Sequence, residues 1–326
     1  MRYVCVFTLL LAGIAAQAQD GATVYKEHCA SCHNSATPRV PSESALHGMQ
    51  LTQILAALQT GVMKPVGDKL TPQERYAVGM FLSAPQPKAV PPPASGSCGT
   101  TAPTLRVSSS SPRWLGWSSS SDNWRFQDSR AAGITAADVP KLKLKWAFGL
   151  GDEISARSQP AVAGGRIFFG TSSGSVYSLD AHTGCIYWST SIDVGIRSAL
   201  VLGAPKNAKH AAVYFGAGQY AYALDAATGK QLWKTRIGEH FASIITAAPL
   251  FHDGVLYFGI SSYEEALPPL PTYECCTFRG SVVALKADTG KILWRSYTIA
   301  NAPEPTEKNK AGVQMYGPSG AAVWST

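Results

Sequence analysis

The chain has 326 residues, of which 45% are hydrophobic and 15% charged, with a formal net charge of +7. This length suffices for two or three domains, and the composition excludes both a disordered chain and a membrane-embedded one. The basic residues are scattered and form no run of the kind that binds nucleic acid, so we predict no nucleic-acid partner.

Residues 1–18 have the pattern of a signal peptide. Arg2 is the charged end, an apolar run extends from Val4 to Ala16, and Ala16-Gln17-Ala18 offers small residues for cleavage. The apolar run is too short to span a bilayer, and no later stretch approaches the required length of about 20 residues. We therefore expect a protein exported to the periplasm, with no transmembrane segment in its mature chain.

The strongest chemical signal is the C-x-x-C-H motif Cys29-Ala30-Ser31-Cys32-His33. Two thiols at this spacing can each form a thioether with a vinyl group of haem c, and the adjacent histidine can bind the iron. A thioredoxin-like redox pair would lie on a βαβ pattern, and a zinc site would offer a second Cys/His pair nearby. Neither is found, so we predict haem attachment at Cys29 and Cys32 and iron ligation by His33.

Three helices are predicted around this motif. A short one begins at Gly21 and ends before the cysteines, and a second carries apolar residues three and four apart between Leu51 and Leu58. A third begins at Thr71-Pro72, with Glu74 completing a capping box. Three helices around one haem resemble a small class I cytochrome c, an all-α domain that we place at residues 19–84.

The cytochrome resemblance implies a sixth iron ligand from the loop before the last helix. Gly61-Val62-Met63-Lys64-Pro65 resembles the methionine loop of that family, so Met63 is the predicted ligand. Met49, before the second helix, and Met80, for which we expect a packing role in the third, are the alternatives. A thioether ligand raises the haem potential relative to a second histidine, which suits an electron acceptor.

A linker and a repeated segment follow. Residues 85–112 are rich in proline and serine, which predicts a connector without a helix or a central strand. Beyond it, the stretches 176–188, 220–233 and 282–294 share an Ala-x-Thr-Gly turn with a tryptophan four residues after the glycine, and each follows a short β-rich segment. Such a repeat every forty-odd residues predicts the four-stranded blades of a β-propeller.

The repeat also carries a family resemblance. Its form, Leu-Asp-Ala-x-Thr-Gly-x-x-x-Trp with a departure at Lys286 in the third copy, resembles the tryptophan-docking repeat of pyrroloquinoline quinone (PQQ) dehydrogenases. Together with the haem c domain it is most similar to quinohaemoproteins of the polyvinyl-alcohol-dehydrogenase type. That resemblance implies PQQ with Ca²⁺, an alcohol substrate, and a downstream cytochrome or other electron acceptor. Because outer-membrane-assembly propellers share the repeat, a non-catalytic scaffold fused to haem c is the alternative.

The length of the repeated part departs from that family. A PQQ propeller has eight blades, which at about 45 residues per blade need about 360 residues. About 213 residues lie between Trp114 and Thr326. We therefore expect a multidomain chain whose all-β propeller, residues 113–326, is incomplete and has about three to four of eight blades.

Adjacent cysteines occur in an insertion of sixteen residues within the third repeat. In many PQQ alcohol dehydrogenases a vicinal disulfide lies against the quinone and an arginine follows it, and the resemblance implies a PQQ-binding role for Cys275, Cys276 and Arg279. The alternative is a disulfide from this loop to Cys98 or Cys185. Cys98 and Cys185 would otherwise pair with each other, closing a long loop and stabilising the fold by about 4 kcal/mol.

Three residues occupy one equivalent place ahead of the blade strands: Arg157, Arg197 and Thr246. In a propeller this place faces the central channel, where the PQQ carboxylates would lie, and arginine binds a carboxylate through two parallel hydrogen bonds. The alternative is a position on the surface or at a blade edge.

No local motif matches the catalytic aspartate or the calcium ligands of the PQQ family. Glu153, Glu264 and Glu265 are acidic residues in predicted loops. We expect them to be solvated surface carboxylates.

Overall fold

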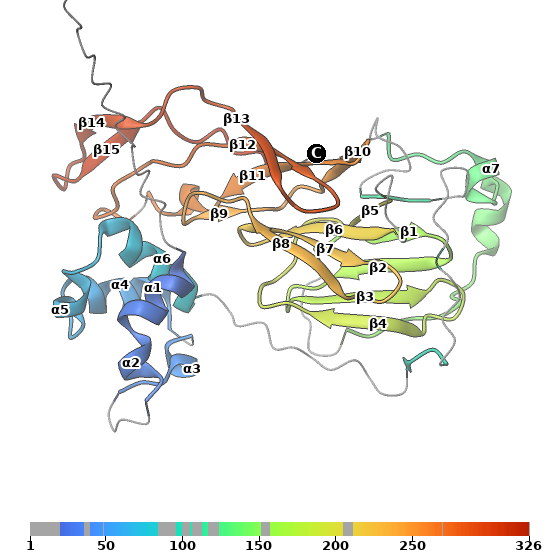
Figure 1. Ribbon diagram of the computed structural model, residues 1–326, viewed down its shortest axis with the longest axis horizontal. Helices are drawn as coiled ribbons and strands as arrows, with labels where there is room; N and C mark the ends of the chain where they lie inside the picture. The colour runs from blue at the N-terminus through green and yellow to red at the C-terminus, as the bar shows by residue number, and fades with distance from the viewer. Residues whose placement is uncertain are drawn as a thin grey trace, which may run out of the picture.

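The structure is a computed structural model in which a group of short helices lies beside a series of antiparallel sheets (Figure 1). The residues that it describes are 20–35, 40–47, 49–83, 96–99, 105, 113–116, 124–150, 157–204, 211–268 and 270–325. The predicted signal peptide, residues 1–18, lies outside the described residues, as does most of the predicted linker at 85–112.

The secondary structure described between residues 20 and 83 is helical. The helices are α1 (Gly21–His28), α2 (Ala30–His33), α3 (Glu43–Leu46), α4 (Leu51–Gln59), α5 (Lys64–Gly67) and α6 (Pro72–Ser83). Asp20 caps α1 by accepting a hydrogen bond from the Thr23 amide at 2.9 Å. Thr71 and Glu74 form the capping box of α6, because the amide of each donates to the side chain of the other, at 2.8 and 3.2 Å.

These helices enclose one small core, which we call the haem-domain core. Its buried residues come mainly from α1, α4 and α6 and include Val24, Tyr25, Cys29, Ile54, Leu58, Leu70, Val78 and Leu82. Helix α1 crosses α6 closely at Gly21, where any Cβ would collide with the Ala77 carbonyl. Because Cys29 belongs to the core, the C-x-x-C-H motif begins against apolar side chains.

The chain beyond residue 157 forms three antiparallel sheets, each built on four strands that follow one another in sequence. The strands of the first are β1 (Ala161–Ala163), β2 (Arg166–Gly170), β3 (Ser175–Asp180) and β4 (Ile186–Ser191). The strands of the second are β5 (Val201–Gly203), β6 (Ala212–Ala217), β7 (Tyr220–Asp225) and β8 (Gln231–Arg236). The strands of the third are β10 (Leu250–His252), β11 (Val255–Ser262), β12 (Ser281–Lys286) and β13 (Ile292–Tyr297), with β9 (Ser243–Ile244) paired to the end of β11. Buried apolar side chains fill the space between the first and second sheets and that between the second and third.

Tryptophans connect each blade to the segment that precedes it. The indole N–H donates to the alanine carbonyl of the following Ala-x-Thr-Gly turn in three pairs, Trp146 to Ala181, Trp188 to Ala226 and Trp233 to Ala287, at 3.3, 3.1 and 3.0 Å. The turn glycines have positive φ angles, and a Cβ on Gly229 would fall within 2.5 Å of the Trp188 ring. Glycine is therefore required twice over, for the backbone conformation and for the close approach of the ring.

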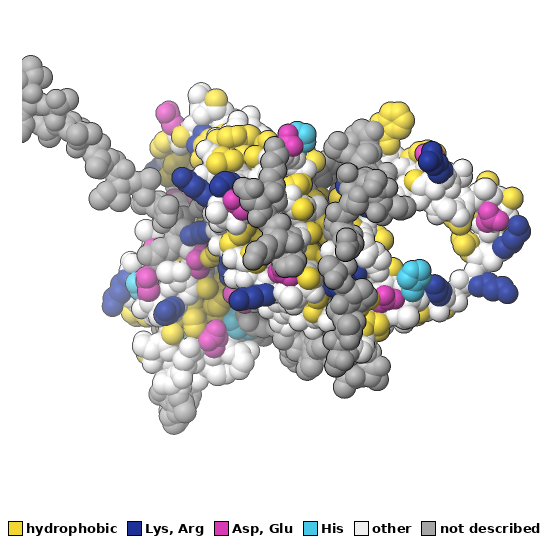
Figure 2. Space-filling view, turned by 45° about the vertical axis from the view of Figure 1, so that its right-hand side comes forward, with side chains coloured by type: hydrophobic (Ala, Val, Ile, Leu, Met, Phe, Trp, Pro, Cys, Tyr) yellow, Lys and Arg dark blue, Asp and Glu magenta, His cyan; other side chains and the backbone are white. Residues whose placement is uncertain are grey.

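The remaining elements lie around the sheets. They are α7 (Ser129–Ala132), the 3₁₀ helices η2 (Ala136–Lys141) and η3 (Glu264–Ala266), and the hairpin of β14 (Glu304–Lys308) with β15 (Gln314–Gly317). Of the helices in the described part of the chain, none combines the length and the apolar character needed to cross a membrane. Figure 2 shows Lys and Arg side chains interspersed with acidic and apolar ones on one face of the molecule.

Candidate functional site

The C-x-x-C-H motif lies where α1 passes into α2. Cys29 joins the two helices and is buried, whereas Cys32 is exposed on the next turn. Burial, together with the nearby Cys32, raises the pKa of the Cys29 thiol to about 11. The first thiol is therefore protonated at neutral pH in the haem-free chain.

His33 is held so that one ring nitrogen is available to a metal. Its ring is buried, and Nδ1 lies 2.8 Å from the carbonyl oxygen of Pro41. A carbonyl can only accept, so Nδ1 carries the proton and the lone pair is left on Nε2. Metal-binding histidines are commonly oriented in this way, so the residues of the motif fit haem c.

The methionines separate into two groups. Met63 lies at the start of α5, and both it and Met49 pack against the haem-domain core. Met80 packs instead in a different cluster, at the junction with the sheets. Met63 and Met49 are thus the methionines that lie beside the core containing Cys29, and the choice between them stays a prediction.

The structure joins the remaining cysteines of the described chain in two disulfides. Cys98 pairs with Cys185 across 87 residues, and the Cys98 amide also donates to the Ile186 carbonyl at 2.9 Å. Cys275 pairs with its neighbour Cys276. The vicinal pair lies in the loop between β11 and β12, which we call the disulfide loop and define as residues 263–280.

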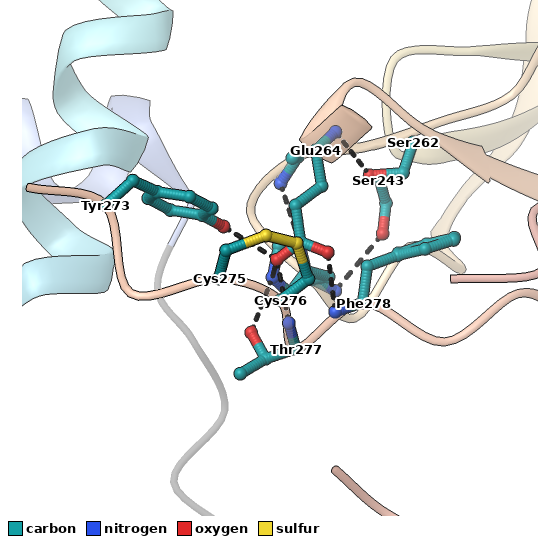
Figure 3. A network of polar contacts seen from close by, with 10 residues as sticks. Ser243, Ser262, Glu264, Tyr273, Cys275, Cys276, Thr277 and Phe278 are labelled. Atoms are coloured by element: carbon teal, nitrogen blue, oxygen red, sulfur yellow. Dashed lines mark hydrogen bonds and ion pairs between the residues drawn. A yellow bond between two sulfur atoms is a disulfide. The ribbon is translucent and has the colours of Figure 1, made fainter. Parts of the chain in front are cut away.

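A buried carboxylate organises the disulfide loop (Figure 3). Glu264 is 3% exposed, so the prediction of a solvated surface carboxylate was wrong for this residue. Its Oε1 accepts hydrogen bonds from the Tyr273 hydroxyl at 2.7 Å and the Thr277 amide at 2.8 Å, and its Oε2 accepts from the Phe278 amide at 2.9 Å. Burial of a carboxylate is tolerated because these three donors replace water. Glu265, in contrast, is exposed as expected, and Glu153 lies outside the described residues.

His240 completes this network from the segment between β8 and β9. Its Nδ1 accepts from the Ala242 amide at 3.2 Å, which leaves the proton on Nε2, 3.0 Å from the Thr277 hydroxyl and 3.4 Å from Glu264 Oε1. Burial lowers the pKa of His240, and the opposing effect of Glu264 is smaller. The imidazole is therefore neutral at pH 7 and serves as a hydrogen-bond donor to the loop.

An apolar cluster connects the helices to the disulfide loop. From α4 and α6 it contains Leu51, Leu55, Tyr76, Ala77 and Met80, and from the β-rich part Phe241, Ala242, Leu267, Leu270, Tyr273, Cys275, Cys276 and Met315. The Tyr76 ring meets the Tyr273 ring edge to face, with centroids 4.6 Å apart and planes at 76°. We call this set the junction cluster, and it includes both cysteines of the vicinal disulfide.

The three residues predicted to face the channel hold equivalent positions. Arg157, Arg197 and Thr246 each lie four residues before an inner strand, which begins at Ala161, Val201 or Leu250. Arg157 is exposed, and Arg197 and Thr246 are half-buried. The Arg197 guanidinium donates to the Tyr263 hydroxyl at 2.6 Å, next to Glu264 in sequence. Arg197 is therefore the member of the three that contacts the disulfide loop.

Arg279 makes its contacts on the other side of that loop. Its guanidinium lies 3.7 Å from the centroid of the Tyr297 ring, at the end of β13, and donates to the Ala300 carbonyl at 2.9 Å. It also lines a cavity of about 590 Å³, together with Arg236, Arg295 and Tyr297. Arg197 thus contacts the disulfide loop from the segment before β5, whereas Arg279, which belongs to that loop, contacts Tyr297 of the outer strand β13.

Comparison with known proteins assigns the two parts of the chain. Residues 124–319, more than half of the chain, match the family model PQQ_2, described as outer membrane protein assembly factor BamB. Residues 16–82 match a second family model, described as cytochrome C oxidase, cbb3-type, subunit III. The chain belongs to the PQQ-type propeller family.

Relatives confirm the predicted resemblance of this PQQ-type chain to quinohaemoprotein alcohol dehydrogenases. Two are polyvinylalcohol dehydrogenases, from Sphingopyxis sp. (strain 113P3) and Pseudomonas sp., with 41% and 38% identity over 96% and 98% of this chain. The chain spans 50% and 53% of their respective lengths, about half of each. The quinohemoprotein alcohol dehydrogenase of Comamonas testosteroni is 28% identical over 59% of this chain and 27% of its own. Its solved structure gives a TM-score of 0.45, at 26% identity over 58% of this chain and 27% of that one.

Sequence reasoning did not find Glu264, His240 or Tyr273 as members of the site. The available signal was the insertion that separates β11 from β12, which is where all of the loop contacts of Glu264 are made. An acidic residue at the start of an insertion that also carries paired cysteines is a candidate for an internal anchor.

Proposed function

We propose that this protein is a periplasmic quinohaemoprotein that oxidises secondary alcohols, polyvinyl alcohol among them, at PQQ and passes the electrons to haem c. The names of the relatives and the match to a cytochrome model support this assignment. A soluble or membrane-bound carrier, such as a downstream cytochrome, would then take the electrons from the haem.

The observation that carries the proposal is that α4 and α6 serve two clusters at once. Ile54 and Leu58 of α4 belong to the haem-domain core, while Leu55 of the same helix belongs to the junction cluster with Cys275. Helix α6 does the same, with Val78 on one side and Tyr76 on the other. Because a helix with its side chains is about 10 Å across, the vicinal disulfide and the haem-domain core are about one helix apart.

The donors near the inner strands suit a quinone that carries several carboxylates. When bound, PQQ supplies the two-electron chemistry of alcohol oxidation. We propose that Arg197 and Thr246 contact its carboxylates, with Arg157 at the equivalent place in the first blade, and that Cys275 and Cys276 lie against its ring. Arg279 belongs to the same proposed PQQ site. Its contacts with the Tyr297 ring and the Ala300 carbonyl would hold the disulfide loop in place.

The proposed activity includes calcium and a catalytic aspartate, but we assign no residue of the described chain to either. Among the residues that the structure describes, no group of three or more His, Cys, Asp or Glu side chains is placed to hold a metal ion.

We also propose the domain limits given by the sequence: a cytochrome domain at 19–84, a linker at 85–112 and a propeller from 113, preceded by a signal peptide at 1–18. The complete ring would have eight blades. Support comes from Trp294, which is 46% exposed although its counterpart Trp188 is buried by the next blade. A following blade would cover Trp294 in the same way.

The test uses the protein expressed from its complete open reading frame and loaded with haem, PQQ and Ca²⁺. Addition of polyvinyl alcohol or 2-propanol should reduce the haem, seen as the sharpening of its visible bands. Haem that stays oxidised with every alcohol would instead favour the scaffold that the BamB description suggests. A protein without covalent haem on a denaturing gel would remove the quinohaemoprotein assignment itself.

The sixth iron ligand has its own test. Met63→Ala should abolish the sulfur-to-iron absorption of the oxidised protein near the red end of the visible spectrum, because the thioether is lost. Met80→Ala is the matched control and should keep the band, since Met80 packs in the junction cluster. If the band survives Met63→Ala and disappears in Met49→Ala, the ligand is Met49.

A further inference from the structure

Glu264 is hydrogen-bonded to both sides of the vicinal disulfide. Tyr273 lies two residues before Cys275, and Thr277 and Phe278 follow Cys276 directly. All three donate to the same carboxylate, as Figure 3 shows. The two cysteines are therefore the middle of a short segment whose two ends are fixed to one buried group.

The same carboxylate also acts on the surface that the helices contact. The Tyr273 hydroxyl that donates to Glu264 belongs to the ring that packs edge to face on Tyr76 of α6. The rings of Tyr76 and Phe241 are also neighbours, with centroids 6.4 Å apart. Movement of Tyr273 would therefore disturb the packing of α6 as well as the position of Cys275.

The hairpin β14–β15 also holds the disulfide, through backbone hydrogen bonds of Tyr316. The Tyr316 amide donates to the Cys275 carbonyl at 2.7 Å, and the Cys276 amide donates to the Tyr316 carbonyl at 3.4 Å. These bonds fix the backbone of the two cysteines, whereas Glu264 fixes the residues around them. The segment that carries the disulfide is thus held both by a backbone pairing and by the Glu264 side chain, which a substitution can change without altering the backbone pairing.

We propose that Glu264 is a positioning residue, whose carboxylate holds the Cys275–Cys276 disulfide in the junction cluster and thereby sets the rate at which electrons reach the haem. The electron-transfer part of this inference rests on the proposed function. The positioning part does not, because it follows from the hydrogen bonds and the burial of Glu264.

Glu264→Gln is the informative substitution because it keeps the size of the side chain. A carboxylate accepts on both oxygens, but the glutamine amide has only one accepting atom. Its NH₂ group would face a donor, either the Phe278 amide or the pair formed by Tyr273 and Thr277. At least one of the three hydrogen bonds to the loop would therefore be lost. Glu265→Gln is the matched control, since Glu265 is the adjacent exposed glutamate.

The experiment compares three rates in the holoprotein. The first is the rate of haem reduction after mixing with 2-propanol. The second is the rate at which 2-propanol reduces a small artificial dye added as electron acceptor. The third is the rate at which a phosphine cleaves the Cys275–Cys276 disulfide, measured by alkylation and mass spectrometry. Loss of a charge-assisted hydrogen bond changes an equilibrium or rate constant that depends on it by about tenfold or more. For Glu264→Gln we expect haem reduction to slow about tenfold, phosphine cleavage to accelerate about tenfold, and dye reduction to change by less than about twofold.

Several outcomes separate this inference from the proposed function. If wild-type haem is not reduced by alcohol, the proposed function fails, while the phosphine measurement still tests the positioning role. If Glu264→Gln is folded and matches the wild type and Glu265→Gln in haem reduction and phosphine cleavage, the inference is overturned. If Glu264→Gln does not fold, Tyr273→Phe replaces it, because it removes one donor and keeps the ring on Tyr76. An effect of about threefold in the same directions supports the inference, and wild-type rates overturn it.

Discussion

Two carboxylates in the β-rich part of the molecule have the same kind of partners at very different distances along the chain. Asp180, the last residue of β3, accepts hydrogen bonds from the amides of His182 and Thr183 at 2.9 and 2.8 Å. Glu264 accepts from a hydroxyl and two amides that lie nine to fourteen residues later. The arrangement at Asp180 recurs at Asp225, in the turn of the second blade.

The difference shows what each carboxylate stabilises. A short-range partner fixes the shape of a turn, whichever fold contains it. A partner ten or more residues away forms only when the surrounding structure has closed, so it stabilises a tertiary arrangement. We therefore expect large losses of stability when contacts between blades are removed and small ones when contacts within a turn are removed.

The largest effect is expected for a tryptophan that joins two blades. Trp188 is buried, packs against Phe168 and donates to the Ala226 carbonyl 38 residues away. Trp188→Ala should lower the free energy of unfolding by about 3 kcal/mol or more, because it leaves a cavity between two blades. Chemical denaturation followed by circular dichroism at equal protein concentration measures the change.

Trp294→Ala is the control for this prediction. Trp294 has the same place in the third repeat but is 46% exposed. In the chain described here, its loss should cost about 1 kcal/mol or less, since little buried area is given up. We attribute the stability to the packing of the indole on the turn of the next blade. If Trp188→Ala and Trp294→Ala lowered the free energy of unfolding equally, this explanation would be wrong.

The division between short-range and long-range contacts also decides how much could be predicted from the sequence. The C-x-x-C-H motif, the capping box at Thr71 and the tryptophan-bearing turns depend on residues a few positions apart, so their patterns are visible in the sequence. The burial of Glu264 depends on Tyr273, whose ring packs on Tyr76 of α6. The insertion that carries the paired cysteines marks Glu264 as a candidate, but it does not indicate these distant contacts. The sequence also predicted equivalent places for Arg157, Arg197 and Thr246, but not that Tyr263 is the partner of Arg197.

A smaller effect is expected at Asp180, and it depends on pH. The Tyr187 hydroxyl donates to Asp180 at 2.7 Å, and this bond, with those from Thr183 and His182, lowers the pKa of Asp180 to about 2. A carboxylate whose pKa is lowered by folding stabilises the fold above its unfolded pKa of about 4 and loses that contribution as the pH falls toward 2. Asp180→Asn should therefore cost about 1 kcal/mol at pH 7, after allowance for solvent screening at this partly exposed turn.

The pH profile distinguishes the charge from the shape of the side chain. The difference between wild type and Asp180→Asn should shrink as the pH falls from about 4 to 2. Tyr187→Phe removes the largest cause of the lowered Asp180 pKa and keeps the ring under Arg166. It should therefore narrow the pH range over which the stabilisation by Asp180 is lost. A difference that is constant over the whole range would mean that the amide disturbs the turn sterically.

The smallest effect is a gain, and it uses the third turn, where the repeat departs from its pattern. Lys286 stands where the first two turns have aspartate, and its ammonium lies 3.0 Å from the Asp288 carboxylate. The double substitution Lys286→Asp with Asp288→Ala gives this turn the sequence of residues 225–229. It should add an acceptor for the amides of residues 288 and 289 and remove an exposed ion pair of little value. We expect a stabilisation of about 1 kcal/mol or less, seen as a rise of about 2 °C in Tm. Asp288→Ala alone should leave Tm nearly unchanged, and a fall in Tm for the double variant would show that the third turn needs its lysine.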